Sequence, residues 1–182
     1  REEAAHEVMS SAGLRDEEDV FAGVFPSTRR RLLWLGINLV TAFLAAAVVG
    51  IFTGTIDALP ILAVFMPIVA GMGGNAATQT LTVTVRGIAL GELSWSNSRK
   101  ALMKEAAVGI GNGLALGLVA AAVAWITRGD AVLGLVLGAA MVINMFVAAT
   151  AGVLIPLGLR AASIDPALAS SVFITTMTDV FG

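Results

Sequence analysis

Five apolar segments, each near or above the length that crosses a bilayer, occupy most of this chain. About 20 predominantly apolar residues in an α-helix span the hydrocarbon core of a membrane. A chain of 182 residues is too short to bury five such helices in one soluble core, whereas lipid solvates them directly. The pattern predicts an all-α polytopic membrane protein with five transmembrane helices. The expected spans are approximately 32–56, 59–89, 101–126, 131–159 and 167–182.

The composition agrees with a membrane location and narrows the chemistry. The chain is 57% hydrophobic and 13% charged, whereas a soluble domain has about 25% charged residues. It has no cysteine, which excludes disulfides and thiolate metal sites, and its one histidine is His6. The apolar segments contain no pair of carboxylates suited to acid–base catalysis. We therefore expect no enzymatic activity.

Residues 1–30 differ from the rest of the chain because they are polar and acidic. Glu2 to Met9 has the composition of a helix, which Gly13 ends. The chain opens on Arg1, inside this helical pattern, so we expect a fragment of a longer protein. We divide it into a short cytoplasmic connecting helix with its linker, 1–30, and a membrane domain, 31–182.

Basic residues at the segment ends predict the orientation, because cytoplasmic flanks of membrane helices are enriched in Lys and Arg. They precede the first span, join the second to the third, and join the fourth to the fifth. These residues are Arg29, Arg30 and Arg31, then Arg86, Arg99, Lys100 and Lys104, then Arg160. The other two links hold at most one basic residue. The N-terminus is thus expected in the cytoplasm and the C-terminus outside.

Small and amide residues in the third and fourth spans predict helix packing. Gly109, Gly113 and Gly117 recur at every fourth position, a spacing that lets helix backbones approach closely in lipid. Asn144 is an intramembrane amide, for which we expect an interhelical hydrogen bond.

The second span contains an unusual glycine-rich polar stretch, Pro67 to Gln79. Its glycines weaken a helix and permit unusual backbone angles, so we expect this span not to be one regular helix. Two polar pairs follow, each one helical turn apart, and they are Asn75 with Gln79 and Thr78 with Thr82. Irregular backbone at membrane depth requires burial in protein or contact with water. The stretch is therefore either a buried kink with hydrogen-bonded amides or the lining of a pore.

Asp179, in the fifth span, is the strongest single candidate for function. An ionisable group within a membrane span is costly and marks a functional site by default. No Lys or Arg in a neighbouring span neutralises it, so its partner is a proton, a cation or another chain. Two copies of Asp179 on a twofold axis, with threonine hydroxyls and main-chain carbonyls, would offer hard oxygen ligands suited to Mg²⁺ or Ca²⁺.

Asp165-Pro166 precedes the fifth span. It is either a helix N-cap followed by proline in the first turn, or a carboxylate that shares a cation with the acidic N-terminal helix.

These motifs resemble those of the MgtE magnesium channels. Pro67 to Gln79 is similar to the second-span signature of that family, and Asp165 to Leu168 with Thr175 to Asp179 is similar to its fifth-span signature. The resemblance covers residues 30–182, and residues 1–25 resemble the connecting, or plug, helix. Family members carry a cytoplasmic N domain and paired CBS domains before it, and those are absent from this sequence.

The resemblance implies a homodimer in the inner cell membrane, with a pore on the twofold axis lined by the second and fifth spans. Asp179 would be the main selectivity carboxylate, with Thr175 and Ser171 beside it in the metal site. The implied pore-lining residues are Gly71, Gly74, Asn75, Thr78 and Thr82. The implied regulatory cation site at the cytoplasmic mouth is Asp165 with Glu2 or Glu3. Thr78 and Ser171 replace an Asn of a relative, although both remain oxygen donors.

The function that this resemblance implies is passive, gated Mg²⁺ influx driven by the membrane potential, with Mg²⁺ as the transported ion. The alternative is a coupled exchanger of Mg²⁺ against Na⁺ or protons, in which Asp179 would serve as a proton-linked site.

Overall fold

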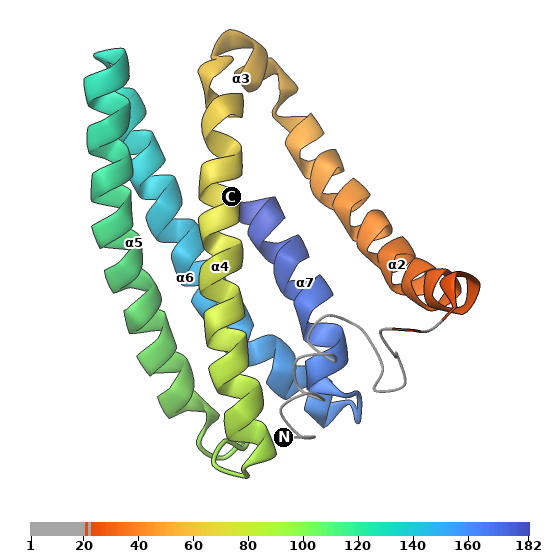
Figure 1. Cartoon of the computed structure of the whole chain (residues 1–182). Helices are drawn as coiled ribbons and strands as arrows, with labels where there is room; N and C mark the ends of the chain where they lie inside the picture. Colours follow the sequence, from red (N-terminus) through yellow and green to blue (C-terminus); the bar gives the residue numbers. More distant parts are fainter. Residues whose placement is uncertain (1–20, 22) are drawn as a thin grey trace.

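The computed structural model describes residue 21 and residues 23–182, and this part of the chain is built of helices without strands. The connecting helix expected within residues 1–20 lies outside the described residues. Figure 1 shows the helices as a bundle of long rods. Their bounds are α2 Val24–Ile51, α3 Thr53–Ala58, α4 Ile61–Ala89, α5 Ser98–Arg128, α6 Ala131–Ala161 and α7 Pro166–Phe181. The prediction of an all-α fold is confirmed.

Four helices, α2, α4, α5 and α6, are long and apolar enough to cross a membrane. The fifth expected span corresponds to α7, which has 16 residues and is shorter than the ~20 residues of a full span. The first expected span is divided, because α2 ends at Ile51 and the short helix α3 follows it. α2 begins with Pro26 in its first turn, where a missing backbone N–H costs no hydrogen bond.

The prediction that the second span is irregular was wrong. α4 is one helix of 29 residues that continues through Pro67. In the described part of the chain, positive φ occurs only at Gly91, Gly129 and Ser163, so the α4 glycines keep ordinary helical angles. Backbone groups in lipid have no water to bond to and stay in the helix ladder. Glycine on α4 therefore provides room for neighbours instead of a break.

α6 is the central helix, which packs against α4, α5 and α7. Its closest partner is α5, whose glycine stripe lies on α6 as the every-fourth-residue spacing predicted. A Cβ added at Gly109 would lie 2.7 Å from the Met145 carbonyl oxygen, and one at Gly117 would lie 2.8 Å from the Gly138 carbonyl oxygen. The two backbones are thus nearly in contact, which maximises van der Waals attraction between helices in lipid.

α7 and α2 complete the bundle (Figure 1). α7 runs antiparallel to α4, and directly after its end Gly182 lies against Ala70, in the first half of α4. α2 contacts α7 and α3 but slants away from the other helices. Successive long helices alternate in direction. One end of the bundle therefore holds the start of α2, the end of α4, the start of α5 and the end of α6. The basic residues noted above therefore gather at that end.

We predict that Gly113→Ala destabilises the bundle. A Cβ there would lie 2.8 Å from the Val142 Cα on α6, so the two helices must separate, at a cost of about 1–3 kcal/mol. Thermal unfolding in detergent should show a lower midpoint. Gly111→Ala is the matched control on the same helix, because a Cβ at that position meets open space. A Gly113→Ala midpoint equal to that of Gly111→Ala would contradict the close packing described here.

Candidate functional site

One side of α4 is polar and uncovered. Gly71, Asn75, Thr78 and Thr82 are all exposed, and their spacing places them on a single stripe of the helix. The opposite side of α4 is buried against its neighbours. The two polar pairs predicted from the sequence thus lie on the exposed side, because Gln79 is exposed as well. The stretch is therefore an unbroken helix whose amide and threonine side chains are exposed in the single chain, and its role as a pore lining stays a prediction.

The threonines of this stripe satisfy their hydroxyl protons locally. Thr78 donates to the Gly74 carbonyl oxygen and Thr82 to the Thr78 carbonyl oxygen, both at 2.9 Å. A hydroxyl oxygen whose proton is used in this way still has lone pairs. The stripe therefore offers acceptors, the groups that a cation or its hydration water binds.

α7 carries a second uncovered stripe, formed by Ser171, Thr175 and Asp179 at intervals of four residues. Thr175 and Asp179 are exposed and Ser171 is half-buried. The Thr175 hydroxyl donates to the Ser171 carbonyl oxygen at 2.9 Å, in the same local pattern as on α4. Thr178, next in sequence to Asp179, is completely buried instead. The three residues expected in the metal site thus share one face of one helix.

The two stripes lie on the same side of the contact between α4 and α7. Ala70 lies against Gly182 and Gly74 lies near Thr178 at that contact, and Ala77 and Ile174 belong to one buried apolar cluster there. On each helix, the polar stripe lies roughly a quarter turn around the helix axis from the residues that contact the other helix. The turn is in the direction in which the chain winds, at about 100° per residue. Antiparallel helices turn in opposite senses when viewed from one end, so both stripes face the same way. We call Gly71, Asn75, Thr78, Thr82, Ser171, Thr175 and Asp179 the polar face.

Asp179 also borders a cavity of about 290 Å³ beyond the end of α7. Its other walls are mostly apolar side chains of α2, α3, α4 and α6, such as Val48, Phe65 and Leu137. A hydrated cation needs oxygen atoms around it. The polar face provides them and the cavity does not, so the polar face is the candidate ion site.

Asn144 of α6 holds α4 and α7 together behind the polar face. Its amide is fully buried and donates to the Val69 carbonyl oxygen of α4 at 2.8 Å, which confirms the interhelical bond predicted for it. Gly73 makes the contact possible, because a Cβ there would overlap the Asn144 amide. Gly182, directly after α7, lies against the same amide. One side chain therefore sets the spacing of both helices that carry the polar face.

Asp165 lies immediately before α7 and is exposed. Its expected partners in a regulatory cation site, Glu2 and Glu3, lie outside the described residues, so that expectation stays a prediction. In the described part of the chain, no group of three or more His, Cys, Asp or Glu residues is arranged to hold a metal ion.

The sequence analysis missed one buried polar contact, between Thr80 of α4 and Glu105 of α5. The Thr80 hydroxyl donates to Glu105 Oε2 at 3.2 Å, and each residue is less than a tenth exposed. A signal was available, because Glu105 precedes Gly109 by four residues and continues the glycine stripe of α5 toward the start of the helix. A position on that stripe faces α6 and the bundle interior.

The fold and the polar face define a class, a polytopic α-helical membrane protein with a polar surface exposed on two of its helices. The sequence profile of MgtE, described as a divalent cation transporter, matches residues 66–182. The chain belongs to the MgtE family.

Curated relatives agree with this assignment. The chain is 34% identical over 179 residues to a magnesium transporter MgtE of Enterococcus faecalis, a match that covers 98% of this chain. It is 32% identical over 151 residues to one of Bacillus subtilis and 33% identical over 153 residues to one of Thermus thermophilus, covering 83% and 84% of this chain. The chain spans only 34–39% of the length of these relatives.

We predict that Gly73→Ala disrupts the Asn144 contact. The added methyl group would overlap the amide, which must leave the Val69 carbonyl, at a cost of about 2 kcal/mol for a buried hydrogen bond and overpacking together. Thermal unfolding in detergent measures this loss.

The double variant Gly73→Ala with Asn144→Ala tests the cause. If the amide is the obstacle, the double variant is more stable than the sum of the two single effects implies. Strict additivity would show that the two residues do not act on each other.

Proposed function

We propose that this chain forms the pore domain of a magnesium channel, in which two copies meet around a twofold axis and Mg²⁺ passes between them. The observation that carries the proposal is the uncovered polar face of α4 and α7. Polar and ionisable side chains in membrane helices normally face protein or a water-filled cavity, because lipid does not solvate them. Within the described part of a single copy this face has neither, so a second copy with water between the two is the natural cover. Closed twofold dimers are also the commonest homo-oligomers.

The ligand chemistry favours a hydrated divalent cation. Mg²⁺ dehydrates reluctantly and keeps several waters, so it needs a wide site of oxygen acceptors. Two Asp179 carboxylates, with Thr175 carbonyls and Ser171 beside them, would provide the charge and the first acceptors. Gly71, Gly74, Asn75, Thr78 and Thr82 would line the path beyond them. The relatives named as magnesium transporters support Mg²⁺ as the ion.

Passive influx needs no other energy source. An inward-negative potential contributes about 2.3 kcal/mol per charge per 100 mV, and a divalent ion gains twice that.

The gathering of basic residues at one end of the bundle supports a cytoplasmic location for that end. In this proposal α7 belongs to a fifth span that leads outward, residues 31–182 form the pore domain in the inner cell membrane, and residues 1–30 form the plug helix and linker. Asp165 with Glu2 or Glu3 would bind regulatory Mg²⁺, and the longer protein would add the N and CBS domains.

The test is Mg²⁺ flux into liposomes that contain the protein, with no other ion gradient. Asp179→Ala should reduce flux strongly. Substitutions that only orient metal ligands cost roughly 10–100-fold, so loss of a ligand should cost at least as much. Asp57→Ala is the matched control, because Asp57 is an exposed acid on α3, outside the polar face.

Three results would redirect the proposal. Equal flux in wild type and Asp179→Ala would move selectivity to the α4 part of the polar face. Flux that appears only with a sodium or proton gradient would favour the coupled exchanger instead. No Mg²⁺ flux under any gradient would contradict transport by these helices.

A further inference from the structure

Glu105 is a buried carboxylate in a seam that is otherwise made of glycine. It occupies the position four residues before Gly109, in a stripe of α5 where Gly109, Gly113 and Gly117 are all buried against α6. Glu105 itself is 7% exposed. Burying a carboxylate costs free energy unless it is paired and hydrogen-bonded. Helix packing alone would be served by another small residue, so the carboxylate needs a separate explanation.

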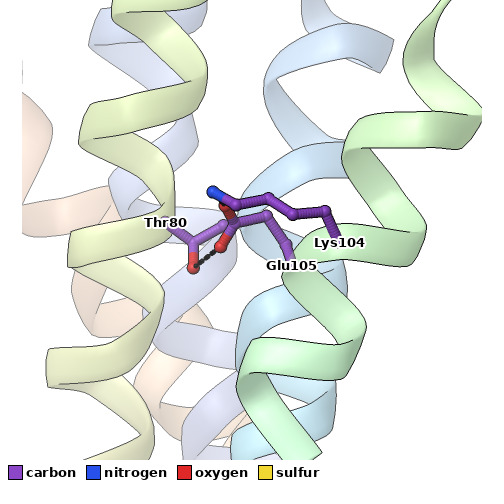
Figure 2. A network of polar contacts seen from close by, with 3 residues as sticks. All are labelled: Thr80, Lys104 and Glu105. Atoms are coloured by element: carbon purple, nitrogen blue, oxygen red, sulfur yellow. Dashed lines mark hydrogen bonds and ion pairs between the residues drawn. The ribbon is translucent and has the colours of Figure 1, made fainter.

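Figure 2 shows the partners of this carboxylate. On one side, Glu105 Oε1 binds the ammonium group of Lys104, whose side chain is 63% exposed and leads toward the surface. On the other side, Oε2 accepts the hydroxyl proton of Thr80 from α4 at 3.2 Å. The two oxygens therefore have different tasks, since one is neutralised on its own helix and the other reaches across to α4.

Thr80 lies on the back of the pore helix. Nine residues, which is two and a half turns, separate it from Gly71, so the two residues are on opposite sides of α4. Gly152 of α6 receives the rest of the Thr80 side chain, because a Cβ there would lie 2.8 Å from the Thr80 Cβ. Thr80 is thus enclosed by α6 at its carbon atoms and bonded to α5 at its hydroxyl.

This arrangement resists rotation of α4 about its own axis. The hydrophobic cluster around Val69 of α4 includes small and flexible side chains of α6, such as Ala140, Met141 and Met145, which tolerate a small turn. A directional bond to a buried carboxylate does not. Side chains reach about 5 Å from a helix axis, so a turn of about 20° would move the opposite face by roughly 2 Å. That shift is comparable to the separation of neighbouring ligand atoms around a cation.

We propose that Glu105 is a positioning residue for the ion path, which acts through Thr80 to fix the rotation of α4 and hence the direction of Thr78 and Thr82 on the polar face. The inference rests on the proposed function, because it assigns Glu105 a role in selectivity for the transported ion. It names a residue that does not itself contact the ion.

The first test compares variants that remove the bond with variants that keep it. Thr80→Val and Glu105→Leu remove the donor and the acceptor, whereas Thr80→Ser and Glu105→Gln retain them. The measured quantity is the ratio of Mg²⁺ to Ca²⁺ flux in liposomes, because a loss of folded protein lowers both fluxes equally and leaves the ratio unchanged. Thr84→Val is the matched control, since Thr84 is buried one turn further along α4 and does not bond to Glu105.

We expect Thr80→Val and Glu105→Leu each to change the flux ratio by about threefold to tenfold, where tenfold corresponds to about 1.4 kcal/mol. The double variant should change it no more than the larger single effect, because both remove the same bond. Thr80→Ser, Glu105→Gln and Thr84→Val should keep the wild-type ratio. Unchanged ratios in Thr80→Val and Glu105→Leu would overturn the proposal. So would a Glu105→Gln variant as impaired as Glu105→Leu, because the negative charge would then be the required property.

A second test does not depend on transport. The chain has no cysteine, so Thr78→Cys gives a single thiol on the polar face. Its reaction rate with a cationic, water-soluble thiol reagent reports how far that position faces water. Val83→Cys provides the background rate, because Val83 is an exposed apolar position of α4 outside the polar face.

In the Glu105→Leu background the Thr78→Cys reaction should slow by at least about threefold, and in the Glu105→Gln background it should not. Equal rates in both would overturn the positioning role even if the channel conducts. Conversely, an Asp179→Ala variant measured alongside reports on the ion path itself. If wild type and Asp179→Ala conduct alike while the labelling rates still differ, the proposed ion site fails and the positioning of α4 stands.

Discussion

The close approach of α5 and α6 is the contact on which the rest of the structure depends. Glycine on α5 brings its backbone almost onto that of α6, as the 2.7 Å from a Gly109 Cβ position to the Met145 carbonyl oxygen shows. Helices in lipid associate through such packing and not through hydrophobic burial. With α5 fixed on one side, α6 presents Asn144 and Gly152 on its other sides. Those two residues hold α4, and Asn144 also lies against the end of α7. The polar face is therefore built outward from the α5–α6 seam.

Polar groups in this bundle fall into two sets, those that bond across helices and those that bond within one helix. Asn144, Thr80 and Glu105 are buried and bonded across helices, which ties α4 to α5 and α6. The threonines of the polar face bond only to their own helix. The first set uses its hydrogen-bonding groups to hold helices together, and the second set retains oxygen acceptors that could bind a ligand. A binding site depends on a supporting shell that packing and hydrogen bonds hold in place, and the first set provides such a shell behind the polar face.

The sequence predicted the helical class, the glycine seam and the polar residues of the uncovered face, because each depends on spacing along one helix. It failed where the outcome depended on a neighbouring helix. The glycines of Pro67 to Gln79 indicated a break, yet Gly73 serves only to admit Asn144, which comes from 71 residues further along the chain. Glu105 was overlooked because the charge of the neighbouring Lys104 indicated a membrane edge. The position of Glu105 on the glycine stripe indicated burial instead. Helical spacing identifies a face, but only the packed structure identifies what that face meets.

Within the polar face, the side chains differ in how strongly they require a partner. Threonine hydroxyls bonded to the preceding turn are tolerated in contact with lipid, since their protons are already satisfied. Asp179 differs, because an ionised carboxylate in a membrane-spanning segment is costly without a partner. The half-buried Ser171 and exposed Thr175 extend a line of oxygen atoms toward it along α7. In the proposed orientation, a cation arriving from outside would meet the formal charge of Asp179 first and the weaker acceptors of Thr175 and Ser171 after it, and the requirement of that charge for a partner supports an ion over lipid as the neighbour of this face.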